Sequence, residues 1–183
     1  MSKVTSVTGA VIWSLVILGY GTLFCLGSLD NARGPYFQDI ILDLGLSDTQ
    51  ASVLFAMTSS MGFIAGRLVP RWVGQFRLVP VVRGGLLVMG VGFASISLAH
   101  SLLGLAVTSA LFGLGFGILN VAENLLILEG AKGPVRRRLF SGLHGMYAVA
   151  SLISPLIPAL LFKLGWGWRD AFVAYLTIVL LGL

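Results

Sequence analysis

The chain has 183 residues, of which 57% are hydrophobic and 10% charged, and its mean hydropathy is +0.97. Soluble domains normally carry about 25% charged residues, so this composition excludes a soluble enzyme, a disordered tail and a fibrous protein. The net charge of +5 does not indicate a nucleic-acid partner, because the basic residues lie between apolar runs. The single cysteine excludes a disulfide framework and a cysteine-based metal site.

Long apolar segments recur along the chain, and a helix needs roughly 20 such residues to cross a bilayer. The last segment is short, because the thirteen residues after Asp170 rise roughly 20 Å as a helix, against a hydrocarbon core of about 30 Å. We therefore expect an all-α membrane protein with six transmembrane helices, the last one truncated as in a fragment. The predicted spans are about 8–29, 49–69, 81–99, 102–128, 139–164 and 170–183.

Basic residues are unevenly distributed among the connections between these spans. They gather before the first span, between the second and third, and between the fourth and fifth, whereas the long connection after the first span is acidic. Because basic connections stay on the cytoplasmic side, the sequence predicts a cytoplasmic N-terminus in a bacterial inner (plasma) membrane. The basic residues on this side are Lys3, Arg67, Arg71, Arg77, Arg83, Lys132, Arg136, Arg137 and Arg138.

The end of the first span carries Asp30, Asn31 and Arg33, which we treat as candidates for binding a substrate or a proton. In a regular helix Asn31 falls on one stripe with Cys25 and other small or polar residues, whereas Asp30 points away from it. Arg33 could hold an anionic group, or it could pair with Asp30 or Asp39.

The fourth span carries Asn120, Glu123 and Asn124. The two asparagines share a stripe with glycines that permit close approach of another helix, and Glu123 flanks this stripe. Polar groups within membrane spans tend to face a cavity or another helix, so we expect the three side chains to converge on one volume. An acid in a low dielectric can be protonated near neutral pH, as a proton-coupling group requires. The alternative is a structural carboxyl group bonded to a neighbouring helix.

In the fifth span, His144 lies at a depth similar to that of Glu123. A pair of these two residues could act as a proton relay, and a packed histidine that donates to a carbonyl is the alternative. Pro155 and Pro158 are expected to bend the span. No cluster of metal ligands and no phosphate-binding loop occurs, so we predict no metal and no cofactor.

Several short segments stand in an order typical of one membrane-protein family. They are residues 45–51 at the start of the second span, 113–117 in the fourth, and 168–172 at the start of the sixth. With them, nearly the whole chain resembles the N-terminal six-helix half of a major facilitator superfamily transporter. Residues 120–124, with His144 downstream, are similar to the fucose-permease-like and related branches.

The resemblance implies two inverted three-helix repeats, in which the first and fourth spans are equivalent. It also implies a small-molecule substrate bound near the bilayer midplane, and a second six-helix bundle as partner. That bundle would be either a missing C-terminal half or another copy of the chain. Acids on the first and fourth helices often serve substrate or proton coupling in such branches. Glu123 matches that type of position, and Asp30 matches it loosely.

The signature that the family carries between its second and third helices is degenerate here. It reads Gly-x-x-x-Asp-Arg-x-Gly-x-Arg-Arg, and Gly66 and Arg71 fit it, but Pro70 stands where the Asp belongs and Arg77 alone closes the loop. The resemblance makes Gly66, Arg71 and Arg77 candidate gating-loop residues that lack their usual acid. The fourth-helix arginine of many proton-coupled members is also missing, with Ser109 near its place.

The sequence therefore favours one half of a secondary active transporter that moves a small solute by alternating access, with proton coupling through Glu123 as a hypothesis. The alternative is a transporter-like fold reused as a non-transport subunit, assembly factor or scaffold in a larger membrane complex. We predict no enzyme, because Ser141 and His144 form the nearest approach to a nucleophile and base and match no nucleophile motif. The sequence leaves the substrate open, and also the choice among uniport, symport and antiport.

Overall fold

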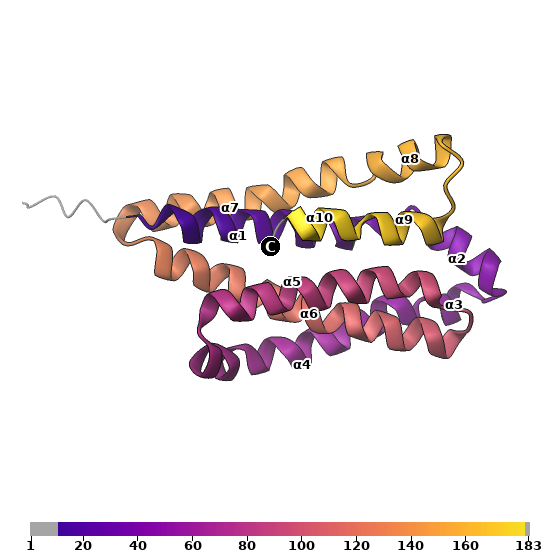
Figure 1. Ribbon diagram of the computed structural model, residues 1–183, viewed down its shortest axis with the longest axis horizontal. Helices are drawn as coiled ribbons and strands as arrows, with labels where there is room; N and C mark the ends of the chain where they lie inside the picture. The colour runs from indigo at the N-terminus through magenta and orange to yellow at the C-terminus, as the bar shows by residue number, and fades with distance from the viewer. Residues whose placement is uncertain (1–10, 182–183) are drawn as a thin grey trace, which may run out of the picture.

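In the computed structural model, the described residues are 11–181, and they form helices joined by short connections (Figure 1). No strand occurs among them, which confirms the predicted all-α class for this part of the chain. Lys3 and the first residues of the predicted first span lie outside the described residues. The elements are α1 (Trp13–Ala32), α2 (Phe37–Leu44), α3 (Asp48–Ala51), α4 (Val53–Phe76), α5 (Leu78–Ser95), η1 (Ile96–Leu98), α6 (Leu102–Gly130), α7 (Gly133–Ile153), α8 (Leu156–Lys163), α9 (Trp168–Ala174) and α10 (Leu176–Leu181).

Five segments of the described chain are long and apolar enough to cross a membrane. In lipid, a helix satisfies its own backbone hydrogen bonds, so apolar runs of this length fold as helices there. The described residues of the predicted sixth span form only α9 and α10, which are shorter than a crossing helix. The five segments are Trp13–Ala32, Asp48–Phe76, Leu78–Leu98, Leu102–Gly130 and Gly133–Lys163.

Local sequence explains several helix ends. Gly45 ends α2 with a φ of 59°, and Ser47 with Gln50 forms a capping box at the start of α3. Pro155 separates α7 from α8, so the fifth span is interrupted where a bend was expected. Pro70 behaves differently, because α4 continues through it to Phe76, although the predicted span ends beside it. Membrane helices tolerate proline where neighbouring groups satisfy the freed carbonyl.

Helix α6 is the centre of the bundle, since α1, α4 and α5 all pack against it. Glycines on two of its faces allow this close packing. A Cβ atom added at Gly117 would collide with the backbone of Gly62 in α4, and one added at Gly115 would collide with the backbone of Met89 in α5. The glycine-rich run of the fourth predicted span therefore sets how near these two helices come.

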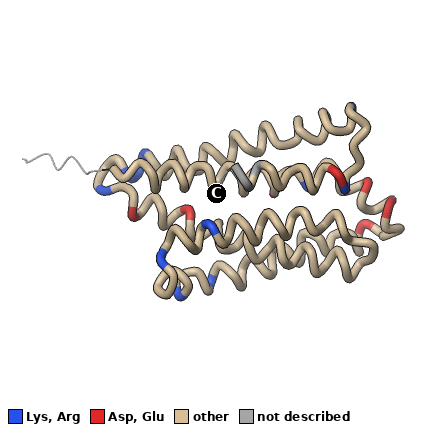
Figure 2. Tube along the Cα trace, in the orientation of Figure 1, with Lys and Arg blue, Asp and Glu red and all other residues tan. Residues whose placement is uncertain are grey.

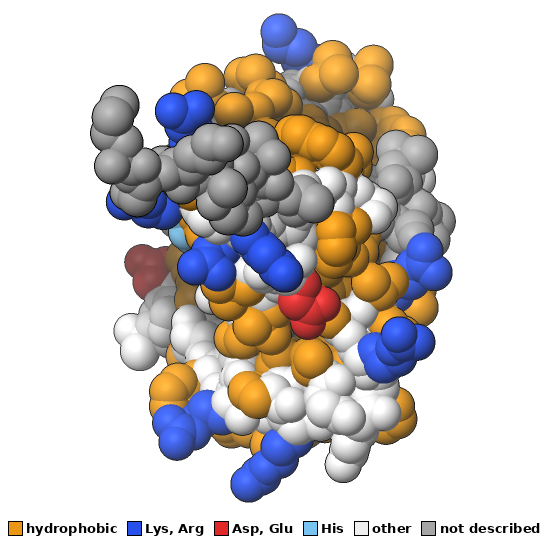
Figure 3. Space-filling model, turned by 90° about the vertical axis from the view of Figure 1, so that its left-hand side faces the viewer, with side chains coloured by type: hydrophobic (Ala, Val, Ile, Leu, Met, Phe, Trp, Pro, Cys, Tyr) orange, Lys and Arg blue, Asp and Glu red, His pale blue; other side chains and the backbone are white. Residues whose placement is uncertain are grey.

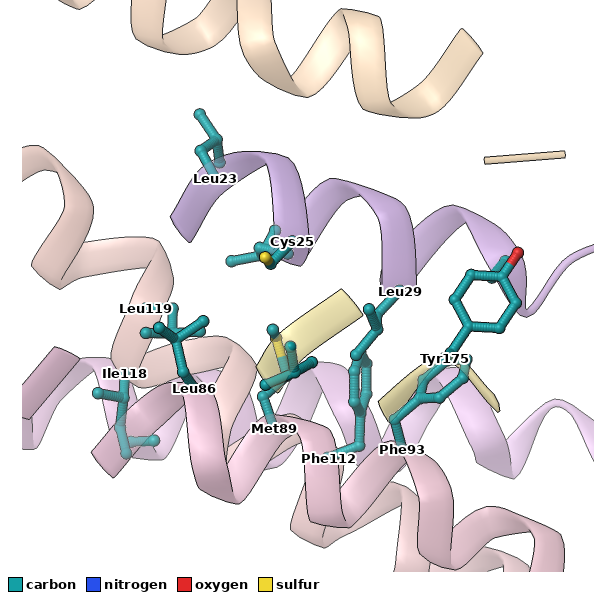
Figure 4. Close-up of a cluster of buried hydrophobic side chains, with 14 of the residues drawn as sticks. Leu23, Cys25, Leu29, Leu86, Met89, Phe93, Phe112, Ile118, Leu119 and Tyr175 are labelled. Atoms are coloured by element: carbon teal, nitrogen blue, oxygen red, sulfur yellow. The ribbon is translucent and has the colours of Figure 1, made fainter. Parts of the chain in front are cut away.

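The hydrophobic core lies between α1, α5, α6 and α9 (Figure 4). Leu29 of α1 and Phe112 of α6 are fully buried in it. Phe93 of α5 stacks on Phe172 of α9 with ring centres 4.4 Å apart, and it meets Phe112 edge to face at 5.6 Å. These aromatic contacts attach α9 to α5.

Basic residues lie mostly toward one end of the bundle and acidic residues mostly toward the other (Figure 2). The end formed by the α4–α5 and α6–α7 connections carries Arg71, Arg77 and the cluster 136–138, and we call it the basic end. Figure 3, which faces this end, shows several basic side chains with apolar surface and an acidic side chain between them. The opposite end, with the aspartates of α2 and α3, is the acidic end. The predicted orientation would place the basic end in the cytoplasm.

Candidate functional site

The predicted site residues lie along α1, α4, α6 and α7, where the structure forms a polar cluster and a mostly apolar pocket. The first is a hydrogen-bonded cluster near the acidic end, which we call the Asp30 cluster. It consists of Asp30, Asn31, Arg33, Thr58, Tyr147 and Ser151. The second is the α4–α6 pocket, a cavity of about 430 Å³ lined by Ser59, Gly62, Phe63, Gly66, Arg67, Phe116, Gly117, Asn120 and Val121.

Arg33 is the buried cation of the Asp30 cluster, with 3% of its surface exposed. It forms an ion pair with Asp30, and its Nη1 donates to Thr58 Oγ1 at 2.9 Å. Its guanidinium carbon lies 4.6 Å from the ring centre of Phe112 and 5.2 Å from that of Phe55. The sequence left open whether Arg33 holds an anionic group or pairs with Asp30 or Asp39, and in the structure it pairs with Asp30. An arginine enclosed in this way has little surface left for a ligand.

Asp30 joins α1 to α7 as well as to Arg33. Its Oδ2 accepts a hydrogen bond from the Tyr147 hydroxyl at 2.9 Å. In a regular helix, Asp30 points away from the polar stripe of α1, as the sequence analysis expected. The long Tyr147 side chain nevertheless reaches it from the neighbouring helix α7. Tyr147 was missed by the sequence analysis, since a lone tyrosine in an apolar run carries no pairing signal.

Asn31 forms a second link between the same two helices. Its Nδ2 donates to Ser151 Oγ at 2.9 Å and to the Gly27 carbonyl at 2.8 Å.

The Thr58 hydroxyl, which accepts from Arg33, also lies 3.4 Å from the carbonyl of Ser109 in α6. Arg33 of the first span therefore stands close to the position where the family resemblance implied an arginine from the fourth.

Tyr36 closes the acidic end of the bundle next to this cluster. It is fully buried, with its ring 4.9 Å from that of Phe162 and 5.7 Å from that of Phe172, centre to centre. Burial, and to a smaller extent the Asp39 carboxylate, raises the pKa of Tyr36 to about 12. The phenol is therefore neutral at physiological pH and acts as a packing group.

Glu123 lies apart from both regions. It is 2% exposed, and its main-chain carbonyl faces Gly19 of α1. The Oε2 atom has no hydrogen-bond partner among the described residues. The expected convergence of Glu123 with Asn120 and Asn124 is not formed, because α1 covers the edge of α6 that carries Glu123.

Asn120 is exposed and lines the α4–α6 pocket. The Asn124 side chain turns back along α6 and donates to the Asn120 carbonyl at 2.9 Å. His144 is exposed on α7, where its spacing places it on one face with Tyr147 and Ser151. No hydrogen bond or ion pair joins His144 to Glu123 in the described part of the chain, so the expected relay pair is not assembled.

The three gating-loop candidates are spread along the basic half of α4 and its end. Gly66 is half-buried, and a Cβ atom there would lie 3.4 Å from Val121 of α6. Arg71 is exposed on α4, and Arg77 connects α4 to α5 with a φ of 69°. Neither arginine has an ion-pair partner within residues 11–181. No metal-binding group of three or more His, Cys, Asp or Glu residues was found in that range either.

Comparison with known proteins finds membrane transporters, although no family model matches the chain. The chain is 26% identical over 158 residues to the sodium-dependent glucose transporter 1A of Mus musculus, covering 83% of this chain and 35% of that protein. It is 31% identical over 171 residues to the monocarboxylate transporter 3 of Gallus gallus, covering 88% of this chain and 30% of that protein.

A crystal structure of the peptide transporter POT in complex with sulfate superposes on 93% of this chain and 36% of that chain, with a TM-score of 0.73 and 18% identity. This likeness shows the fold alone. The chain spans about a third of the length of the two curated relatives it matches. All three proteins are transporters by name, in agreement with the prediction of a non-enzymatic chain. The chain thus has the helical fold of a membrane transporter and is similar in sequence to part of two of them.

Proposed function

We propose that the chain is one half of a secondary active transporter that moves a small solute by alternating access. The observation that carries this proposal is the transporter fold of the chain, with polar residues on α1, α4, α6 and α7. We further propose that its helices form the two inverted repeats of a major facilitator N-terminal half, in the fucose-permease-like or a related branch. A second six-helix bundle, from the same gene or from another copy, completes the substrate site.

Glu123 is the proposed proton-coupling residue. Its side chain is buried, its main-chain carbonyl faces α1, and its Oε2 lacks a partner in the described residues. A buried charge without a partner is costly, so a carboxyl group at this place is suited to take up and release a proton when α1 and α6 move. Asp30 is less suited to this role, because Arg33 and Tyr147 already hold its carboxylate.

Uptake into proteoliposomes tests this role, with glucose and lactate as probe solutes because the two curated relatives are named for glucose and monocarboxylate transport. The full-length protein should accumulate at least one probe when a pH gradient is imposed. Glu123→Gln should abolish this accumulation while exchange of the solute without a gradient persists. Glu129→Gln is the matched control, since Glu129 is exposed on the same helix. Accumulation that is unchanged in Glu123→Gln would refute the coupling role.

The orientation can be tested with single cysteines, because Cys25 is buried. Gln75→Cys lies at the basic end and Gln38→Cys at the acidic end, and both side chains are exposed. A membrane-impermeant thiol reagent applied to intact cells should label Gln38→Cys and spare Gln75→Cys. The reverse labelling would place the N-terminus outside the cytoplasm.

A further inference from the structure

Arg67 of α4 is a charged membrane residue that the proposed function does not use. It lies nine residues before Phe76, the last residue of α4, which corresponds to about 14 Å of helix from the basic end. The side chain is exposed and has no ion-pair partner in the described residues, and its guanidinium carbon lies 5.6 Å from the Phe63 ring centre. An ionisable group within a membrane helix is costly and marks a functional site by default.

The structure places Arg67 in the α4–α6 pocket together with two neutral polar side chains. Ser59, Phe63 and Arg67 follow each other at intervals of four residues, so they share one face of α4. Asn120 of α6 completes the polar lining. Within the described chain, neither the Ser59 hydroxyl nor the Asn120 carboxamide is engaged in a hydrogen bond. Three unoccupied hydrogen-bonding groups from two helices therefore converge on one cavity.

The pocket is held in shape by a close contact between the two helices. Gly117 of α6 packs against the backbone of Gly62 of α4, which leaves no room for a side chain at Gly117. This contact brings Asn120 beside α4 and forms a floor of main chain between the two helices. The walls are the rings of Phe63 and Phe116. A mostly apolar cavity with a few convergent polar groups is the usual form of a small-molecule site.

We propose that the α4–α6 pocket is a binding subsite for a small organic monoanion with an apolar body. The Arg67 guanidinium would take the carboxylate in a bidentate pair, and Asn120 and Ser59 would donate to the remaining lone pairs of the same two oxygens. Arg67 is the one charged residue that lines this cavity among the described residues, so no acid competes for it. The inference rests on the proposed transport function and adds a substrate class to it.

Binding of benzoate and benzamide to the full-length protein tests the subsite, because the two probes share a shape and differ in charge. Titration calorimetry in detergent at one fixed pH should give benzoate an affinity about tenfold or more above that of benzamide, as expected for a charge-assisted hydrogen bond. Arg67→Gln should abolish this preference, and Arg67→Lys should retain part of it. Arg71→Gln is the matched control, since Arg71 is exposed on the same helix outside the pocket.

Equal binding of the two probes, or a preference for benzoate that survives Arg67→Gln, would overturn the proposal. Equal binding would be expected if an acidic side chain of the second bundle occupied Arg67, and a surviving preference would mean that another group holds the carboxylate. Thermal unfolding of each variant shows whether it is folded. Asn120→Ala gives a second test, because it should lower the affinity for benzoate severalfold while Arg67 is intact. If uptake depends on Glu123 but the Arg67 preference is absent, the transport proposal stands and this one fails. If benzoate binds through Arg67 but no solute is taken up, the subsite proposal stands and the transport proposal fails.

Discussion

The Asp30 cluster and the α4–α6 pocket each contain an arginine on a membrane helix, but the two arginines are in opposite states. Arg33 is buried and bonded to Asp30 and Thr58. Arg67 is exposed and has no such partner in the described residues. A cation with a hydrogen bond from each of its nitrogens holds helices together, whereas a cation with unbonded nitrogens is available to a ligand. The contrast separates a structural cluster near the acidic end from a candidate binding surface at the middle of α4.

The largest effect is expected from Asp30→Ala, which breaks the ion pair of the Asp30 cluster. This change leaves Arg33 buried without its counter-charge, and breaking a buried ion pair costs about 3 kcal/mol or more. The free energy of unfolding in detergent, measured by denaturant titration, should fall by that order. Arg67→Ala is the comparison, and it should cost less than about 1 kcal/mol, because the residue is exposed and unpaired. Equal losses in the two variants would remove the distinction between the regions.

A smaller loss is expected when the floor of the pocket is disturbed by Gly117→Ala. The added methyl group would meet the backbone of Gly62, and overpacking of this kind costs about 1–3 kcal/mol. Gly74→Ala serves as the control, since a Cβ atom at Gly74 meets nothing within 4 Å in the same bundle. The melting temperature should drop for the first variant alone. A stable Gly117→Ala protein would show that α4 and α6 can separate freely.

Removing one hydrogen bond from the Asp30 cluster should have a moderate effect on stability. Tyr147→Phe deletes the hydrogen bond to Asp30 and leaves the ring in place, so it should cost about 1–2 kcal/mol. His144→Ala, on the same face of α7, should change the unfolding free energy little, because His144 is exposed. If Tyr147→Phe were neutral, the link between α1 and α7 would have to rest on Asn31 and Ser151.

The smallest effect on stability is expected at the pocket itself. Asn120→Ala removes an exposed carboxamide that forms no side-chain bond in the described residues, so the unfolding free energy should change by less than about 0.5 kcal/mol. The same variant should weaken ligand binding. A loss of stability comparable to that of Tyr147→Phe would instead assign Asn120 to helix packing.

Sequence reasoning was most successful where the cause is local. The apolar runs and the interruption at Pro155 are visible in the sequence, and the Asp30–Arg33 pair spans one helical turn. It failed where the cause lies in a neighbouring helix. Asn120 and Glu123 are three residues apart, yet one faces the pocket and the other is buried, because α1 packs on one side of that part of α6. Arg67 was interpreted only as a mark of orientation, since its depth and its neighbours do not follow from charge counting.

By itself, the sequence determined that this chain is a helical membrane protein, because a bilayer leaves an apolar chain few other ways to satisfy its backbone. It also determined, through helical periodicity, the direction in which each polar residue points about its own helix axis. Only the tertiary structure decided which neighbouring helix or cavity each of these side chains faces. That choice depends on the close glycine contacts of α6 with α4 and α5 and on the position of α1, which together bury Glu123, enclose Arg33 and leave Arg67 open.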